Sequence, residues 1–272
     1  MLSIVTANVN GIRAALRRGG LAWLAAAEAD VLCLQEVRAT AQQLTDVLAA
    51  GGLGDWQVAS APAARAGHAG VAVLTRAEQS AVRRWSAPGN HGFADQGRWV
   101  EVDLDLPDGP LTVISSYLHT GEADTPRQVE KYAFLDAITE RLAELAARSA
   151  AGGGEAVLTG DLNIAHRPED LKNWKGNLGR AGFLEAERAY LDGWFASGWS
   201  DLGRLHGGDG PGPYTWWSWR GKAFDNDSGW RIDLHVATAG LAAKAVSAVT
   251  ERAATYADRW SDHAPVTVRY DI

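Results

Sequence analysis

The amino-acid sequence predicts an α/β fold in which helices cover mixed β-sheets. Short apolar runs with strand character recur along the whole chain, and helical patterns lie between several of them. Several neighbouring runs have no helix between them, which favours mixed sheets over a purely parallel barrel. With 272 residues, of which 46% are hydrophobic, the chain has ample apolar material for a full core.

Eight runs are predicted as strands because they are short and rich in apolar residues. In chain order they are Leu2–Ala7, Val31–Leu34, Gly70–Leu74, Trp99–Leu106, Leu111–Tyr117, Ala156–Thr159, Ile232–Ala237 and Ala264–Tyr270. The clearest helix covers residues 125–148, where Thr125 supplies an N-cap and Pro126 occupies the first helical position. Apolar side chains recur in it at helical spacing, at Val129, Tyr132, Phe134, Leu135, Ile138, Leu142 and Leu145.

A triple glycine at 152–154 ends this helix. It is too short to be a linker between two domains, and a predicted strand follows it directly. We therefore predict one domain that spans residues 1–272, with candidate site residues in both halves.

The charge and cysteine content bear on the class of protein. A net charge of −7 argues against a general nucleic-acid coating protein, but it is compatible with an enzyme whose acids bind a cation. No segment resembles a membrane span, and the start of the chain lacks the basic region of a signal peptide. The one cysteine, Cys33, lies in a predicted buried strand, so we expect no disulfides and a location in the reducing cytoplasm. Because no span is found, we also expect no membrane partner.

Four short motifs place acids, amides or an imidazole beside predicted strands. They are Leu34–Glu36, Gly160–Asn163, Arg231–Asp233 and Ser261–His263. Taken together they supply several carboxylates and one histidine, a set that suits a divalent cation and a phosphate ester.

The first two motifs each have a structural alternative. A carboxylate such as Glu36 at the end of a strand is a hard ligand for Mg²⁺, although a solvated loop acid has the same pattern. Asp161 and Asn163 would face the same side of an extended backbone, where they could handle a proton and orient water or phosphate. An Asx-type turn explains the same two residues equally well.

Asp262 and His263 are adjacent, so in extended backbone they point to opposite faces and have different partners. His263 then needs another carboxylate to fix its tautomer, and Asp233 is the candidate. Several tryptophans precede Asp233, at Trp216, Trp217, Trp219 and Trp230. We expect most of them to pack in the core and one or two to line a pocket for a sugar or base.

Taken in order, these motifs resemble the exonuclease III / apurinic-apyrimidinic (AP) endonuclease family of the endonuclease–exonuclease–phosphatase superfamily. The similarity runs nearly end to end, through Thr6–Ala14, Leu34–Glu36, Ala66–Ala72, Gly160–His166, Asp170–Asn177, Tyr214–Trp217, Gly229–Asp233 and Ser261–Pro265. It implies a DNase I-like four-layer α/β sandwich with two packed mixed β-sheets.

The resemblance also implies a role for each candidate residue. It makes Glu36 the principal Mg²⁺ ligand, with Asn10 and Asp262 nearby, and it gives Mn²⁺ as a substitute for Mg²⁺. It assigns Asn8 and Asn163 to orienting phosphate and water. Asp161 takes the role of proton handling, by activating water or by serving the leaving oxygen. Further implied contacts with the phosphate or the substrate are those of Asp233, His263, Tyr117, Arg13, Asn177, Trp216, Trp230 and Ile232.

Two positions depart from the family pattern. Leu118-His119 follows Tyr117 where the family usually has a proline second after the tyrosine, which puts the shape of that loop in question. Val37 replaces a usual threonine after Glu36. Neither change removes a group assigned to catalysis.

The function implied is that of a Mg²⁺-dependent DNA phosphodiesterase of base-excision repair, acting as a monomer in the bacterial cytoplasm. It would cleave 5′ of abasic sites in double-stranded DNA, process blocked 3′ ends, or do both, and leave a 3′-hydroxyl. One alternative is a catalytically inactive relative that regulates nucleic-acid processes, and another is a superfamily phosphatase acting on a different phosphoester.

Overall fold

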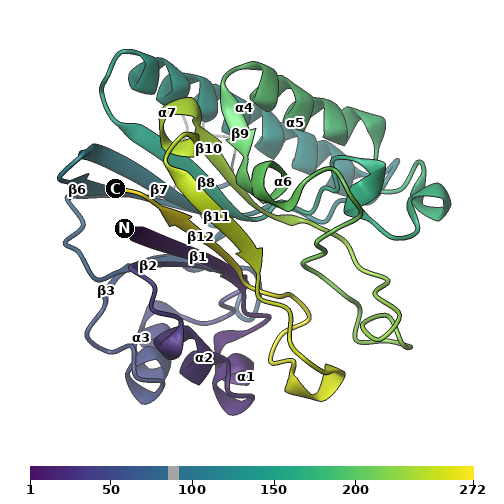
Figure 1. Ribbon diagram of the computed structural model, residues 1–272. Helices are drawn as coiled ribbons and strands as arrows, with labels where there is room; N and C mark the ends of the chain where they lie inside the picture. Colours follow the sequence, from purple (N-terminus) through teal and green to yellow (C-terminus); the bar gives the residue numbers. More distant parts are fainter. Residues whose placement is uncertain (85–91) are drawn as a thin grey trace.

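Two six-stranded mixed sheets pack against each other, with helices on their outer faces (Figure 1). The computed structural model describes residues 1–84 and 92–272. This architecture confirms the predicted α/β class and the two packed mixed sheets.

The first sheet joins strands from both ends of the chain, in the order β11-β12-β1-β2-β4-β3. Within it β1 and β2 are parallel, and the remaining neighbours are antiparallel. Parallel pairing places the C-terminal ends of β1 and β2 at one edge of the sandwich. The strands are β1 (Leu2–Asn8), β2 (Val31–Gln35), β3 (Gln57–Ala61), β4 (Val71–Thr75), β11 (Ala245–Thr250) and β12 (Val266–Tyr270).

The second sheet has the order β5-β6-β7-β8-β10-β9, with β7 and β8 parallel. Asp161, at the end of β8, is in register with Tyr117 of β7 on one side and with Asp233 of β10 on the other. Three predicted site residues are therefore cross-strand neighbours. The strands are β5 (Ala81–Arg84), β6 (Trp99–Leu106), β7 (Gly109–Tyr117), β8 (Glu155–Asp161), β9 (Trp199–Asp201) and β10 (Asp233–Thr238).

Helices cover the outer face of each sheet, which gives the four layers (Figure 1). Beside the first sheet lie α1 (Ile12–Arg17), α2 (Gly20–Ala26) and α3 (Ala41–Ala50). Beside the second lie α4 (Pro126–Ala150) and α5 (Glu185–Ala196), with the short α6 (Leu202–Gly207) and α7 (Ala239–Ala242) near its β9–β10 side. Within residues 1–84 and 92–272 the connections also contain three 3₁₀ turns, η1 (Pro168–Asp170), η2 (Trp174–Asn177) and η3 (Tyr256–Asp258).

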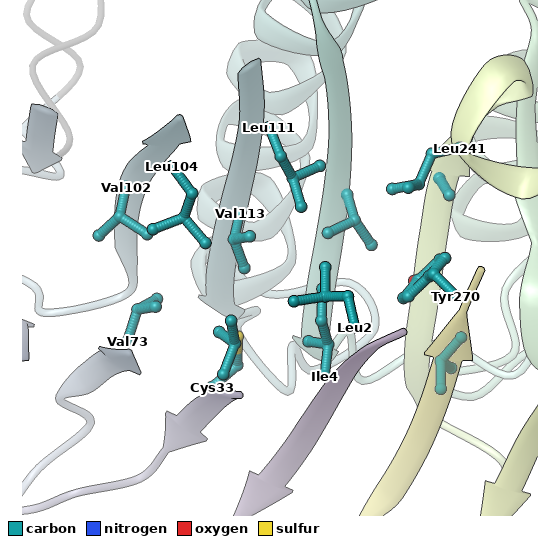
Figure 2. Close-up of a cluster of buried hydrophobic side chains, with 14 of the residues drawn as sticks. Leu2, Ile4, Cys33, Val73, Val102, Leu104, Leu111, Val113, Leu241 and Tyr270 are labelled. Atoms are coloured by element: carbon teal, nitrogen blue, oxygen red, sulfur yellow. The ribbon is translucent and has the colours of Figure 1, made fainter. Parts of the chain in front are cut away.

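The central core lies between the sheets, where apolar side chains from both pack together (Figure 2). Ile4 and Cys33 of the first sheet belong to the same buried cluster as Leu104 and Val113 of the second. Burial of Cys33 agrees with the expectation that this thiol is a core residue. Each fully buried aliphatic side chain of this kind stabilises the fold by about 1.5–3 kcal/mol.

The elements differ from the predictions in three respects. The strands β3, β5, β9 and β11 are absent from the predicted set because none of them is a continuous buried apolar run: β9 has only three residues, and β3, β5 and β11 are partly exposed. Helix α4 begins as predicted, with the Thr125 hydroxyl accepting from the Arg127 amide, and it ends two residues later than predicted. Val129 has helical spacing but is 67% exposed, so it is not part of the core.

Among the described residues, no helix combines the length and the apolar character needed to cross a bilayer.

A buried histidine links the stability of this fold to pH. His235 of β10 is 1% exposed, and its Nε2 donates to the carbonyl of Val266 at 3.1 Å. Burial lowers the pKa of His235 to about 4, despite opposing effects of that hydrogen bond and of Asp201. Between this value and the ordinary pKa of about 6.5, the unfolded chain binds the proton and the folded chain does not.

We predict that the stabilising contribution of neutral His235 is fully present above pH 6.5 and is lost as the pH falls toward 4. The difference in unfolding free energy between the wild type and His235→Gln, measured with urea, should shrink by about 2 kcal/mol from pH 7.5 to pH 5. Glutamine retains a donor for Val266 but does not titrate. A difference that stays constant with pH would contradict the prediction.

Candidate active site

The candidate residues meet at one edge of the sandwich because both sheets end there. Asn8 is the last residue of β1, and Glu36 directly follows β2. From the second sheet, Asp161 ends β8 and Asp233 begins β10. The two parallel pairs, β1–β2 and β7–β8, thus direct side chains from distant parts of the sequence to one place.

The side-chain amide of Asn8 connects the two sheets. Its Nδ2 donates to Glu36 Oε1 at 2.9 Å and to Asp161 Oδ2 at 2.9 Å, while its Oδ1 accepts from the Asn10 amide at 3.0 Å. Asn8 is fully buried and does not line the pocket described below. Both of its N–H donors are engaged, so we expect it to hold the two carboxylates and not to contact a phosphate directly.

The backbone around these residues is strained. Asn10, Glu36 and Asn163 have φ angles of 44°, 50° and 49°, in the left-handed region that non-glycine residues rarely adopt. Each costs on the order of 1 kcal/mol and persists where surrounding contacts fix it, which is typical of functional sites. Gly160 has a φ of 129°, and a Cβ at this position would lie 2.0 Å from the carbonyl oxygen of Ser116. A glycine is therefore required immediately before Asp161.

The left-handed backbone at Asn163 corrects one prediction. Asp161 and Asn163 were expected to share a face through extended backbone, but the strand ends at Asp161. They meet because Asp161 Oδ1 accepts from the Asn163 amide at 3.0 Å, and both line the pocket. The Asn163 side chain is held by donation from its Nδ2 to the Leu118 carbonyl at 2.9 Å. The local geometry resembles the Asx-type alternative while still directing both residues to the site.

Burial dominates the protonation of Asp161. It raises the pKa of this carboxyl to about 7; the His263 charge opposes this increase, and the charges of Asp233 and Glu36 add to it. A carboxyl that titrates near neutrality can take up or release a proton under ordinary conditions.

His263 and Asp233 form the predicted pair. The Nδ1 of His263 lies 2.9 Å from Asp233 Oδ2, and its Nε2 lies 3.8 Å from Asp161 Oδ2. Burial alone would lower the pKa of His263, but the charges of Asp233 and Asp161 raise it to about 10. The imidazole is therefore held in its cationic form, with Nε2–H available toward the pocket.

Asp262 has partners of its own, as predicted for two adjacent residues. Its Oδ1 accepts from Asn10 Nδ2 at 2.7 Å, and its Oδ2 accepts from Trp216 Nε1 at 3.2 Å. The two residues of this motif thus contribute separately to the same site.

A pocket of about 300 Å³ opens beside these groups. Trp216, Trp230 and Ile232 form the apolar part of its lining, and Trp216 and Trp230 contact each other edge to face. Two of the four tryptophans singled out in the sequence, Trp216 and Trp230, line the pocket as predicted. The expectation that most of the four pack in the core was wrong, since Trp217 is buried but Trp219 is partly exposed. The residues lining the pocket are Glu36, Tyr117, Thr120, Asp161, Asn163, Ala181, Gly182, Trp216, Trp230, Ile232, Asp262 and His263.

Two predicted substrate contacts lie outside this pocket. Arg13 is exposed on α1, and Asn177 is at the end of η2, where its Nδ2 donates to the Asn173 carbonyl at 2.8 Å. Their contact with a substrate stays a prediction.

Sequence reasoning missed several residues that shape the site. Arg38 forms an ion pair with Glu36, and Arg98 places its guanidinium 4.9 Å from the centre of the Tyr117 ring. Thr120, Ala181 and Gly182 also line the pocket. Arg38 lies two residues after Glu36 and could have been noticed, whereas nothing in the sequence around Arg98 marks it.

The two departures from the family pattern are both accommodated. Val37 is buried in the core beside the first sheet. His119 is buried, and its Nε2 donates to Gln96 Oε1 at 2.7 Å, while Gln96 Nε2 donates to Glu130. Burial lowers the pKa of His119 to about 3, so a neutral imidazole anchors the loop after Tyr117.

The donor atoms present suit a hard divalent cation. One ligand atom from each of Glu36, Asp161 and His263 lies within 4.8 Å of the other two. The carboxylates of Glu36 and Asp161 are oxygen donors that Mg²⁺ and Mn²⁺ accept readily, whereas His263 in its cationic form has no lone pair to offer a metal. Asp262 and Asn10, the other predicted ligands, hydrogen-bond to each other at 2.7 Å, and their role toward a cation stays a prediction.

Comparison with known proteins gives a consistent result. The profile of the Endonuclease/Exonuclease/phosphatase family matches residues 5–263. An exodeoxyribonuclease of Bacillus subtilis is 30% identical over 273 residues, covering 100% of both chains. Among solved structures, an AP endonuclease from Archaeoglobus fulgidus has a TM-score of 0.85 at 25% identity, and a Neisseria 3′ phosphatase bound to product DNA hairpin has 0.82 at 25%. Each of these two alignments covers 100% of this chain and 100% of the chain in the solved structure.

We predict that Asp233→Asn lowers the pKa of His263, because it removes the carboxylate charge that favours the imidazolium. The midpoint of the His263 titration, followed by ¹⁵N NMR of the imidazole, should fall by roughly 1–2 pH units. Asp258→Asn, at the exposed end of the η3 turn, serves as the control and should leave the midpoint in place. An unchanged midpoint in Asp233→Asn would show that Asp233 does not govern this histidine.

Proposed function

Because the chain belongs to the Endonuclease/Exonuclease/phosphatase family, we propose that it is a metal-dependent DNA repair nuclease. It hydrolyses a phosphodiester 5′ of abasic sites and at blocked 3′ ends of double-stranded DNA, and it leaves a 3′-hydroxyl. The observation that carries the proposal is the buried junction at which Asn8 holds Glu36 and Asp161 together beside His263. The exodeoxyribonuclease relative and the DNA-bound 3′ phosphatase neighbour support a DNA substrate.

Mg²⁺ is the proposed cofactor, and Mn²⁺ can substitute because it accepts the same oxygen ligands. Glu36 would hold the cation, with Asp262 and Asn10 completing the predicted set. When bound, the cation supplies charge neutralisation on the phosphate and the leaving oxygen. The carboxylates of Glu36 and Asp161 are suited to a site for a divalent cation because they are oxygen donors that the fold already brings close together.

The residues of this chain divide the remaining work. Asp161 Oδ2 exchanges a proton with the attacking water or the leaving oxygen, and its raised pKa suits either direction of transfer. His263 Nε2 donates to a non-bridging phosphate oxygen, where its positive charge favours the developing negative charge. Tyr117 and Asn163 line the same pocket and orient the phosphate and water.

The apolar residues that line the pocket determine which part of the DNA can enter it. Trp216, Trp230 and Ile232 leave a pocket of about 300 Å³, which suits a deoxyribose without a base or the sugar of a 3′ end. The protein acts as a monomer in the bacterial cytoplasm, on the nucleoid, with residues 1–272 as one domain. The buried free thiol of Cys33 is compatible with a reducing compartment.

Geometry favours an enzyme over an inactive regulator. Glu36, Asp161 and His263 are all present, buried and mutually close, an arrangement that a purely structural role does not require. A phosphatase of small phosphoesters is the remaining alternative, and a comparison of substrates separates it. The wild type should act in Mg²⁺ on duplexes with an internal abasic site, a 3′-phosphate at a nick or a recessed 3′ end; activity confined to small phosphoesters would contradict the proposal.

We predict that Asp161→Asn lowers kcat on the preferred duplex by at least about 1,000-fold, because the amide cannot accept the proton. Duplex affinity, measured by fluorescence anisotropy with a chelator present, should stay within about threefold of the wild type. The exposed Asp105→Asn is the matched control and should retain full turnover. Near-normal turnover in Asp161→Asn would remove this residue from the mechanism.

We predict that Glu36→Ala weakens cation binding, because it removes the carboxylate that both Asn8 and Arg38 hold in place. The apparent Kd for Mn²⁺, measured by electron paramagnetic resonance without DNA, should rise at least about tenfold. Turnover should fall by orders of magnitude while duplex binding survives. Glu144→Ala, an exposed acid on α4, should leave both quantities unchanged, and wild-type Mn²⁺ affinity in Glu36→Ala would exclude Glu36 as a ligand.

A further inference from the structure

A lysine ion pair is fully buried behind the pocket. Lys131 of α4 and Glu187 of α5 both have side chains that are 0% exposed, and Lys131 Nζ lies 2.7 Å from Glu187 Oε1. Burying two charges is costly, and an apolar pair of similar size is often equally stable. Stability alone is therefore a weak reason for this pair.

The ammonium group also binds the backbone of two pocket loops. Lys131 Nζ donates to the Asn163 carbonyl at 2.9 Å and to the Thr120 carbonyl at 3.3 Å. With the bond to Glu187, all three N–H donors of the ammonium have an acceptor. Thr120 follows β7, Asn163 follows β8, and both line the pocket.

Asn163 is the residue that most needs such support. Its left-handed φ of 49° is unfavourable for a side-chain-bearing residue, and it persists where surrounding contacts fix it. The amide and side chain of Asn163 are bound by Asp161 and Leu118, and Lys131 binds the carbonyl. The conformation is thus fixed at three points, one of which is the buried cation.

Glu187 fixes the other side of the lysine. Its carboxylate accepts from Gln128 Nε2 at 2.9 Å and from the Leu184 amide at 3.1 Å, at the start of α5. The stem of Lys131 also lies against the loop, since a Cβ at Gly121 would come within 3.0 Å of its Cδ. The lysine therefore has little freedom to move away from the two carbonyls.

We propose that Lys131 is a positioning residue, which holds the Thr120 and Asn163 loops in the geometry that the reaction requires. The proposal rests on the proposed nuclease function. Lys131 does not line the pocket, so it acts through the backbone of Asn163 and Thr120 and not through contact with DNA. A displacement of about 1 Å in such groups can cost about 100-fold in rate.

The test compares Lys131→Met with Arg141→Met. Both substitutions remove a cation from α4 and break an ion pair. Lys131 also binds the carbonyls of Thr120 and Asn163, whereas Arg141 pairs with Glu101, which does not line the pocket. Lys131→Met should lower kcat on the preferred duplex about 10- to 100-fold with KM within about threefold of the wild type. Arg141→Met should keep kcat within about twofold.

The double variant Lys131→Met/Glu187→Gln separates positioning from stability, and it also serves if Lys131→Met alone folds poorly. It contains no unpaired buried charge, so its urea midpoint should recover toward the wild type while kcat stays low. Recovery of kcat together with the midpoint would overturn the proposal. A wild-type kcat in Lys131→Met would do the same.

Hydrogen–deuterium exchange without DNA or metal provides a readout that does not depend on activity. Peptides covering 118–124 and 160–166 should exchange faster in Lys131→Met than in the wild type, and their exchange rates should be unchanged in Arg141→Met. An inactive wild type would refute the proposed function, whereas unchanged exchange in these peptides would refute the role of Lys131.

Discussion

The structure of the site depends on one side-chain amide shared between two sheets. Asn8 donates from the same nitrogen to Glu36, beside the first sheet, and to Asp161, at the end of the second. These bonds hold two carboxylates close together in a buried setting, where like charges oppose each other. Burial of this junction raises the pKa of Asp161, and the nearby charges of Asp233 and Glu36 add to the increase.

The surrounding contacts make that arrangement rigid. Gln35, which ends β2, donates across the sheets to Ser115 Oγ of β7 at 2.9 Å, so the sheets are bonded together just behind the site. Gly160 lets β7 and β8 approach closely, and Asp233 holds His263 from the next strand. Strained backbone at Glu36 and Asn163 is tolerated because hydrogen bonds fix it on several sides. Such pre-organisation favours electrostatic catalysis, since the groups need not reorient during reaction.

The sequence was informative where a polar group follows a continuous apolar run. This pattern located Glu36 and Asp161. Strand β11 escaped notice because it has no buried apolar run: Val246 and Val249 are exposed, and its other residues are only partly buried. The extended backbone expected at Asn163 was wrong because a left-handed turn follows β8. Lys131 could not be identified, since a lysine in an amphipathic helix normally reaches solvent, and only the packing of α5 shows that it is buried.

The central claim is that this junction hydrolyses a phosphodiester, and the fate of the solvent oxygen tests it most directly. A duplex with an internal abasic site is cleaved by the wild type with Mg²⁺ in ¹⁸O-labelled water, and the masses of the fragments are measured by mass spectrometry. The account predicts one ¹⁸O atom in the phosphate at the new 5′ end and an unlabelled 3′-hydroxyl on the other fragment. A 3′ unsaturated sugar without ¹⁸O in the phosphate would show elimination in place of hydrolysis and would contradict the account.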